Sequence, residues 1–174
     1  LFDARVLGTL NHAIVEYMDE EKTRELWNEV FLSYPDHSPK IKMIKLRNDH
    51  QMNLNILTLQ EVDASSNFNT MSREKYFISH AIHPKIELRG IIDRIDYTDN
   101  KLIIIDYKTS ALTLSSKKIM AGHQLQLITY ALIAKSLFNK DIMGVFYYGF
   151  KLPNIKYSTV KYSAAKGIIH NEST

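Results

Sequence analysis

Two aspartates and a lysine near the middle of the chain have the residue types and the spacing of a hydrolytic metal site. A predicted turn centred between Asp99 and Asn100 joins two apolar strands and places Asp93 directly opposite Asp106. Two unshielded carboxylates opposed on one face of a hairpin repel, and a cation between them would remove that penalty. Lys108 lies two residues after Asp106, on the same face and about 6.6 Å further along the strand. We therefore expect the three side chains to converge.

These residue types suit metal-assisted hydrolysis of a phosphodiester. Carboxylates hold Mg²⁺ or Mn²⁺ against a phosphate oxygen, and the metal supplies a hydroxide. A lysine beside the metal can orient the attacking water and stabilise the charge that develops in the transition state. A structural alternative stays open, because a buried strand such as Leu102–Ile105 often ends in Asp-x-Lys simply where it reaches solvent. The opposed aspartates favour the site, since chance opposition would cost stability.

The composition limits both the class of protein and the kind of metal. The chain has 174 residues, of which 45% are hydrophobic, with six Gly and four Pro, and this favours one folded domain over disorder. The absence of cysteine excludes thiolate zinc sites, iron–sulfur clusters and a cysteine nucleophile. Any metal must therefore bind oxygen or imidazole. The net charge of +3 favours anionic partners only weakly.

Targeting signals are not evident in the sequence. The longest uncharged stretch, residues 121–134, is shorter than the roughly 18 apolar residues of a membrane-spanning helix, so we expect no membrane association. The chain opens at Leu1 without an initiator Met or an apolar signal region. We expect it to be a piece excised from a longer cytoplasmic protein.

The elements that must position the three residues fall into a helical front and a mixed back. Apolar residues at helical spacing, from Val6 to Tyr17 and from Leu26 to Tyr34, predict two amphipathic helices, and a less regular helix extends to Glu61. We place the helical front at residues 1–62, and residues 63–70 form a predicted loop.

The back of the chain, residues 72–162, is predicted to form a mixed sheet. Its order is β-β-β-α-β, and the helix is long enough for a right-handed crossover between parallel strands. Ser115 or Ser116 is the predicted helix cap. The predicted elements are strands at Glu74–Ala81, Ile86–Tyr97 and Lys101–Thr109, a helix through Phe138, a strand at Ile142–Tyr148, and an edge strand at Lys156–Tyr162.

Short motifs occur in a fixed order along the chain. They are Gly8-Thr-Leu-Asn-His12, Gly90-Ile-Ile-Asp93-Arg-Ile-Asp96, Ile105-Asp106-Tyr-Lys108-Thr-Ser and Gln126-Leu-Ile-Thr-Tyr130. In this order they resemble the PD-(D/E)XK nuclease superfamily, specifically the RecB-like nuclease domains of AddB-type or RexB-type helicase-nuclease subunits. Glu74-Lys-Tyr-Phe77 is also similar to a Glu-x-x-Phe segment of this group, although the role of Glu74 stays open.

The resemblance implies roles for individual residues. His12, Asp93, Asp106 and the backbone carbonyl of Tyr107 would ligate a divalent metal, Mg²⁺ or Mn²⁺. Lys108 would act on water and phosphate. Gln126 and Tyr130 would line the site. AddB-type domains commonly carry four cysteines for an iron–sulfur cluster, and their absence here favours the cluster-free RexB-like branch.

The supporting residues also have structural interpretations. A lone histidine such as His12 is usually structural, and an amide and a phenol at i and i+4 can be a polar helix boundary. Gln124 competes with Gln126 for the predicted role. Arg94 alternates away from Asp93, so a salt bridge within the sheet or to the helical front and a contact to a backbone phosphate all stay open. For Tyr147 and Tyr148, at the end of the last long strand, core packing and base stacking are the alternatives.

Taken together, the residues and the resemblance predict a single nuclease domain over residues 1–174. Its fold would be α/β, with a restriction-endonuclease-like αβββαβ core, a mixed sheet and additional N-terminal helices. The implied function is Mg²⁺- or Mn²⁺-dependent DNA hydrolysis, with exonuclease action, in the end-processing and recombinational-repair module of a helicase-nuclease. The implied partners are DNA and a helicase domain or subunit. A nuclease-like module that binds DNA or protein without cleaving is the alternative.

Overall fold

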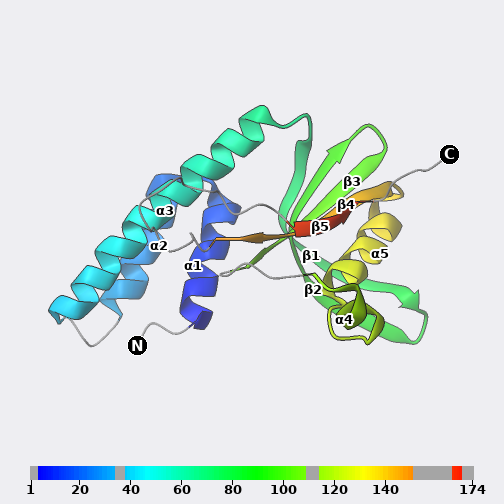
Figure 1. The fold of residues 1–174 in the computed structure, drawn as a ribbon, viewed down its shortest axis with the longest axis horizontal. Coiled ribbons are helices and arrows are strands. Elements are labelled where there is room, and N and C mark those ends of the chain that lie inside the picture. Colours follow the sequence, from blue (N-terminus) through cyan, green and yellow to red (C-terminus); the bar gives the residue numbers. More distant parts are fainter. Residues whose placement is uncertain (1–3, 34–37, 109–113, 151–165, 170–174) are drawn as a thin grey trace. The chain divides into compact units, whose positions relative to one another are not determined.

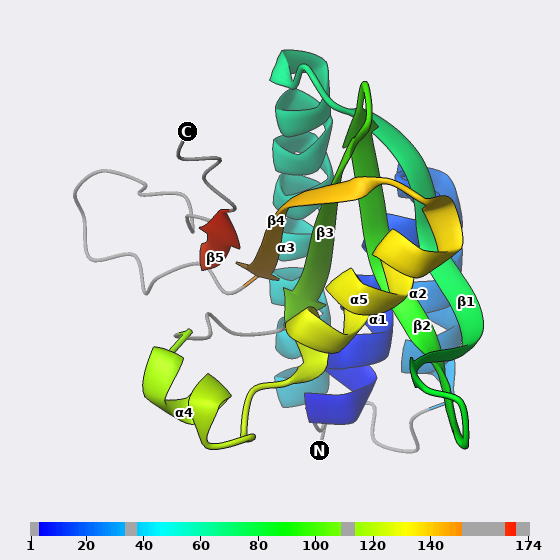
Figure 2. The same cartoon turned by 90° about the vertical axis from the view of Figure 1, so that its right-hand side faces the viewer.

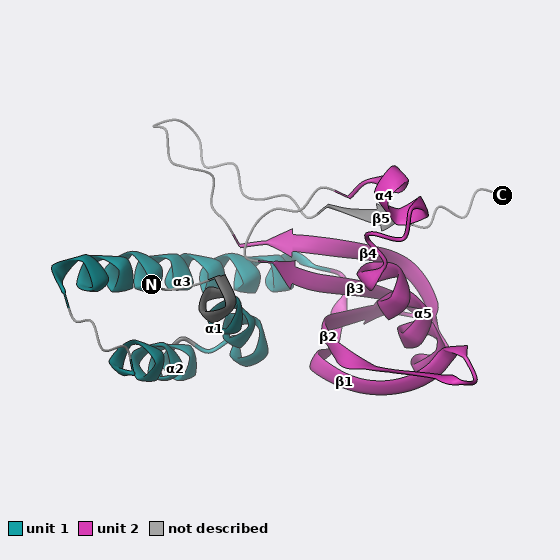
Figure 3. Ribbon diagram, turned by 90° about the horizontal axis from the view of Figure 1, so that it is seen from below, with its two compact units in different colours: residues 1–66 teal, residues 67–174 magenta. Residues whose placement is uncertain are grey.

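The computed structural model describes residues 4–33, 38–108, 114–150 and 166–169 of the chain (Figure 1). It divides into two compact units, residues 1–66 and residues 67–174, which are coloured separately in Figure 3. Helices make up the first unit, and the second contains the sheet with two helices. Within the described residues, no helix combines the length and the apolar character that a membrane crossing requires.

The first unit consists of three helices: α1 (Ala4–Tyr17), α2 (Glu20–Leu32) and α3 (Pro39–Ser65). Asp19 caps α2, because its Oδ1 accepts a hydrogen bond from the Lys22 amide at 2.8 Å. Ser38 caps α3, and Pro39 occupies the first turn, where a missing N–H costs nothing. The two predicted amphipathic helices are confirmed. The predicted loop from residue 63 was placed too early, because α3 continues to Ser65.

Buried apolar side chains of all three helices form the core of this unit. They include Leu10, Ile14, Trp27, Met52 and Leu59, each nearly inaccessible to solvent. The Trp27 indole N–H donates to the Leu10 carbonyl at 3.4 Å, so its polar atom is satisfied inside the core. Helix packing therefore stabilises this unit chiefly through apolar burial.

The second unit contains a five-stranded sheet in the order β1-β2-β3-β4-β5. Its strands are β1 (Asn69–His83), β2 (Ile86–Thr98), β3 (Lys101–Lys108), β4 (Asp141–Gly149) and β5 (Lys166–Ile169). The β3 and β4 strands are parallel and every other neighbouring pair is antiparallel, so the sheet is mixed, as predicted. β1 begins earlier than the predicted Glu74, and the predicted edge strand at Lys156–Tyr162 lies outside the described residues.

The hairpin between β2 and β3 has the predicted register. Thr98 pairs with Lys101 and Arg94 pairs with Ile105, which centres the turn between the two residues that join the strands. Asp99 adopts a left-handed conformation with φ 43°, which aspartate tolerates better than most residues. This register determines which side chains of the two strands share a face of the sheet.

The chain then crosses to β4 through two short helices rather than one. The prediction of a single helix from Ser115 or Ser116 through Phe138 is wrong, because α4 (Ser116–Met120) ends before α5 (Gln126–Phe138) begins. Gly122 between them has φ 79°, a conformation in which a right-handed helix cannot continue. The predicted cap at Ser115 is confirmed for α4.

Helix α5 lies along one face of the sheet (Figure 2). Its buried residues Leu127 and Ile133 belong to one core cluster with Ile95, Leu102 and Ile104 of the central strands. The face that α5 covers is therefore the face to which these three strand residues point. The parallel crossover expected for this connection is confirmed.

Candidate active site

Asp106 and Lys108 lie at the end of β3, on the face covered by α5. They continue the alternation of the core residues Leu102 and Ile104, so their side chains share the same face. The Lys108 ammonium is 2.5 Å from Asp106 Oδ2. Asp106 is 1% exposed, whereas the Lys108 side chain is 28% exposed. The pair thus combines a buried carboxylate with an ammonium that solvent or a ligand can reach.

Asp93 is the second buried carboxylate, at 4% exposure. The β2–β3 ladder pairs residues as far as Arg94 with Ile105, and the same register continued by one residue would place Asp93 across from Asp106. Its Oδ2 accepts a hydrogen bond from the backbone N–H of Tyr107 at 2.7 Å. The expected repulsion between the aspartates is therefore reduced, because Asp93 has this N–H and Asp106 has the Lys108 ammonium as partners.

Gln126 and Tyr130 of α5 extend the cluster. Lys108 Nζ donates to Gln126 Oε1 at 3.1 Å, and Gln126 Nε2 donates to the Tyr130 hydroxyl at 3.0 Å. The competing residue Gln124 is engaged elsewhere, since its Oε1 accepts from the Ser115 amide at 3.0 Å. The structure thus brings Gln126, rather than Gln124, to the lysine.

The pKa of Tyr130 is raised by burial and by nearby acidic side chains. Burial raises this pKa above the usual range, and the hydrogen bond from Gln126 partly offsets the rise. The negative charges of Asp106, Asp93 and Glu74 raise it further. The electrostatic influence of three acidic side chains on one phenol is consistent with a perturbed functional site.

Glu74 is the residue whose role the sequence left open. It lies between Arg73 and Lys75, which pair with Arg94 and Ile92, so its place in β1 is opposite Asp93. One carboxylate oxygen of Glu74 and one of Asp93 lie within 4.8 Å of each other.

The backbone at Glu74 is also unusual for a strand. It has φ 47°, which costs energy for a residue other than glycine and often marks functional sites. The sequence did contain a signal, the Glu-x-x-Phe spacing. With Phe77 opposite Gly90, that spacing places the glutamate opposite Asp93.

The Tyr147 ring packs against the ammonium of Lys108. Lys108 Nζ lies 5.6 Å from the centre of the Tyr147 ring, within the range of a cation–π contact. Burial raises the pKa of Tyr147, and the charge of Asp106 and the neighbouring Tyr130 raise it further. Tyr147 is therefore a buried neutral phenol at ordinary pH.

Tyr107 and Tyr148 form an aromatic cluster with Phe150. The ring centres of Tyr107 and Phe150 are 5.2 Å apart with an angle of 16°, and those of Tyr107 and Tyr148 are 5.5 Å apart. The structure shows Tyr148 packed in this aromatic cluster, and base stacking stays an untested alternative.

Two further predicted ligands stay predictions. His12 belongs to α1 of the first unit, and its metal-binding role stays a prediction. The same holds for the backbone carbonyl of Tyr107, whose N–H orients Asp93.

Arg94 and Asp96 alternate away from Asp93 on β2. The Arg94 Nε donates to Asp96 Oδ1 at 2.7 Å, and both side chains are almost wholly buried. Of the two alternatives for Arg94, the structure shows the salt bridge within the sheet. Its role is thus to satisfy a buried charge beside the site.

The oxygen donors at the site fit a hard divalent cation. Asp93, Asp106 and Glu74 offer carboxylate oxygens, and such ligands suit Mg²⁺ and Mn²⁺ better than softer metals. Among the described residues, the buried carboxylates and the adjoining lysine provide both ligands and a cation for an anionic substrate. The arrangement can therefore hold a phosphate next to a metal ion.

Similarity to known proteins points to the same chemistry. Residues 1–171 match the family model of the PD-(D/E)XK nuclease superfamily. An ATP-dependent helicase/deoxyribonuclease subunit of Carboxydothermus hydrogenoformans is 42% identical over 78 residues, which are 40% of this chain and 7% of that protein. The protein of the same name from Streptococcus mutans is 24% identical over 174 residues, covering 91% of this chain and 16% of that protein.

A third helicase/deoxyribonuclease subunit of this name, from Lactococcus lactis, is 38% identical over 77 residues, or 43% of this chain and 7% of that protein. The chain thus matches only a small part of each of these long relatives. The family match extends over nearly the whole chain, and the mixed α/β sheet with its preceding helices has the fold predicted from the motifs. The chain belongs to the PD-(D/E)XK nuclease superfamily.

Proposed function

We propose that this chain hydrolyses DNA phosphodiester bonds with Mg²⁺ or Mn²⁺ as the nuclease module of a helicase-nuclease. The observation that carries the proposal is the cluster of Asp93, Asp106 and Lys108 on one face of the sheet, beneath Gln126 and Tyr130 of α5. The relatives named as helicase/deoxyribonuclease subunits support DNA as the substrate. They also support a helicase domain or a helicase subunit as the partner.

Asp93 and Asp106 would hold the metal, with Glu74 beside Asp93 and with His12 and the Tyr107 carbonyl as predicted additional ligands. The Tyr107 N–H on one oxygen of Asp93 fixes the orientation of that carboxylate. The bound metal would polarise the scissile phosphate and supply hydroxide near neutral pH. The protein's part is to present these oxygens from a rigid, mostly buried strand end.

Lys108 would orient water and stabilise the negative charge that grows on the phosphate oxygens. Its ammonium is held between the Asp106 carboxylate and the Gln126 amide oxygen, while part of the side chain remains accessible. A cation that is positioned before the reaction needs no reorganisation as charge develops. Gln126 and Tyr130 would line the site and hold the lysine in place.

We propose exonuclease action during DNA end processing in recombinational repair, in the cytoplasm. The relatives' name supports a deoxyribonuclease that works with a helicase, and the resemblance of the motifs implies the exonuclease mode, the repair role and the cytoplasmic setting. A module that starts from DNA ends should degrade linear DNA and spare covalently closed circles.

The test is incubation of the 174-residue chain with linear and circular DNA, single-stranded and double-stranded, in Mg²⁺, Mn²⁺ or EDTA. We expect linear DNA to be shortened from its ends with either metal and to stay intact with EDTA. Cleavage of closed circles would reject exonuclease action, and metal-independent cleavage would reject the metal role. DNA binding without any cleavage would instead show a non-cleaving module.

A further inference from the structure

Phe77 on β1 lies directly over Gly90 on β2. The two residues are paired across the strands. A Cβ atom at Gly90 would come within 2.9 Å of Phe77 Cζ and 3.1 Å of Cε1, so the ring would have to shift. The backbone at Gly90 is not left-handed, so the glycine is needed for the space above it rather than for its conformational freedom. The absence of a side chain at Gly90 thus leaves the space that the Phe77 ring occupies.

The Phe77 ring also contacts Tyr130 of α5. The ring centres of Phe77 and Tyr130 are 5.8 Å apart with an angle of 76°, an edge-to-face arrangement that aromatic pairs prefer. Phe77 is only 4% exposed, so its ring has little freedom to move. A displacement of Phe77 away from Gly90 would therefore be transmitted to Tyr130.

Tyr130 in turn orients the Gln126 amide. Because the Gln126 Nε2 donates to the Tyr130 hydroxyl, the Oε1 at the other end of the amide faces the Lys108 ammonium. An amide that rotated by half a turn would present its NH₂ group to the ammonium, which is repulsive. The position of one phenol therefore determines whether Lys108 has its second acceptor.

We propose that Phe77, packed against Gly90, is a positioning residue that acts on Lys108 through Tyr130 and Gln126. Its predicted effect on cleavage rests on the proposed function, whereas its effect on the Gln126 amide does not. Phe77→Leu retains an apolar side chain but removes the ring that contacts Tyr130. Gly90→Ala keeps the ring and displaces it, so both changes should disturb the same amide.

A double-mutant cycle tests whether Phe77 acts through Gln126. We expect Phe77→Leu to lower kcat for linear DNA by about tenfold with little change in KM, since loss of positioning affects the chemical step. In a Gln126→Ala background the same change should lower kcat by less than about twofold, because the link is already broken. Phe138→Leu is the matched control, because Phe138 packs against the same core from α5 without a ring contact to Tyr130 among the described contacts.

A second measurement is independent of cleavage. In ¹⁵N-labelled protein without DNA, the side-chain amide signals of Gln126 should shift in Phe77→Leu and Gly90→Ala in the direction seen for Tyr130→Phe, and should not shift in Phe138→Leu. If Phe77→Leu does not fold, Phe77→Met, which fills more of the ring's volume, replaces it. If the wild-type chain does not cleave DNA, the proposed function fails, while the amide shifts still test the positioning role. The positioning role would be overturned if the effects of Phe77→Leu and Gln126→Ala on kcat multiplied in the double variant. It would also be overturned if the Gln126 signals did not shift in Phe77→Leu and Gly90→Ala.

Discussion

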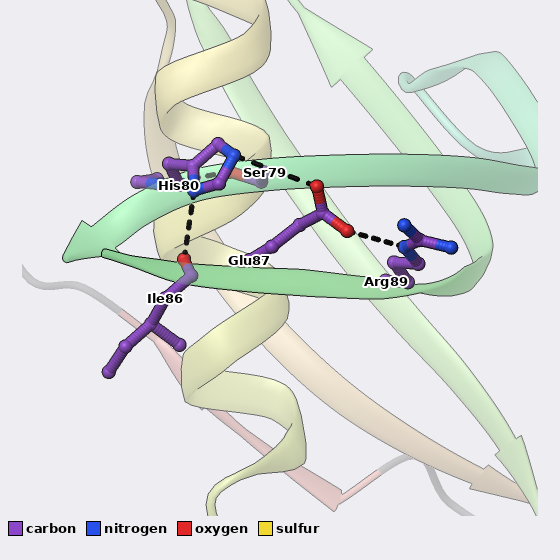
Figure 4. Close-up of polar contacts among 6 residues, drawn as sticks. Ser79, His80, Ile86, Glu87 and Arg89 are labelled. Carbon is purple, nitrogen blue, oxygen red and sulfur yellow. Dashed lines mark hydrogen bonds and ion pairs between the residues drawn. The ribbon is translucent and has the colours of Figure 1, made fainter. Parts of the chain in front are cut away.

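The two halves of β2 carry similar ion pairs in very different surroundings. In the first half, Arg89 Nε is 2.5 Å from Glu87 Oε1, and Glu87 also faces His80 at 3.8 Å (Figure 4). In the second half, Arg94 Nε is 2.7 Å from Asp96 Oδ1. Each pair joins an acid and an arginine two residues apart on one strand. The first pair is exposed, whereas the second is almost wholly buried.

The same contrast separates two lysine–aspartate pairs. Lys135 and Asp141 are joined at 2.7 Å with both side chains about as accessible as ordinary surface residues. Lys108 and Asp106 are joined at 2.5 Å, but Asp106 is buried at the proposed site. Geometry alone does not distinguish these pairs. Burial does, because solvent screens an exposed pair while a buried charge depends on its partner.

The largest expected effect is on catalysis, at the pair that Lys108 forms with the buried Asp106. Lys108→Ala should lower the cleavage rate by at least about 10²-fold, since it removes a positioned cation from the developing charge. DNA binding, measured by fluorescence anisotropy, should remain near the wild-type level because Lys108 is one cation among many. Lys135→Ala makes the same change at the exposed pair and should cleave normally. Equal rates for the two variants would contradict the assignment of Lys108.

The second expected effect is on metal binding. A saturating divalent cation that binds only the folded state should raise the melting temperature of the wild-type chain by about 5–10 °C. Asp93→Asn should lose most of this gain, because it removes a ligand charge from the buried half of β2. Thermal melts with and without Mn²⁺ give the shift.

Glu87→Gln is the control for the metal effect, since it removes a carboxylate from the exposed half of the same strand. It should retain the full gain in melting temperature. A metal response that survives in Asp93→Asn would require a different set of ligands.

The third expected effect is on stability without metal. Asp96→Asn should lower the free energy of unfolding by about 3–5 kcal/mol, because it leaves the Arg94 guanidinium buried with a weakened partner. Glu87→Gln should cost less than about 1 kcal/mol, since its pair is exposed. Urea denaturation of both variants measures the difference. Because Asp96 faces away from Asp93, Asp96→Asn should keep the gain in melting temperature from Mn²⁺. Equal losses of stability in Asp96→Asn and Glu87→Gln would show that burial is not the deciding factor.

The smallest expected effect concerns alkaline pH. Burial raises the pKa of Tyr147 above the ordinary value of 10.0, so the unfolded chain ionises this phenol before the folded chain does. The contribution of Tyr147 to folding stability is complete below its ordinary pKa and is lost as the pH rises through its raised pKa in the folded chain. Tyr147→Phe should therefore lose less stability than wild type between about pH 9 and pH 11. Tyr76→Phe, at an exposed position, is the control, and denaturation curves across this range decide.

The sequence by itself determined the central hairpin. Turn residues and period-two alternation act over a few neighbouring positions, so they specify the register and place Asp93, Asp106 and Lys108 on one face without help from distant contacts. The same local rules separated Arg94 and Asp96 from that face. Three of the four long strands, β2, β3 and β4, were also predicted nearly to their ends for this reason.

Only the tertiary structure decided the residues that complete the site. Gln126 and Gln124 have the same side chain, and the break at Gly122 together with the packing of α5 brought Gln126 to Lys108. Glu74 reaches Asp93 through an unusual backbone conformation that alternation does not predict. The exposed and the buried halves of β2 look alike in sequence, because residue type fixes a charge. Its surroundings depend on elements far along the chain, and these determine what the charge does.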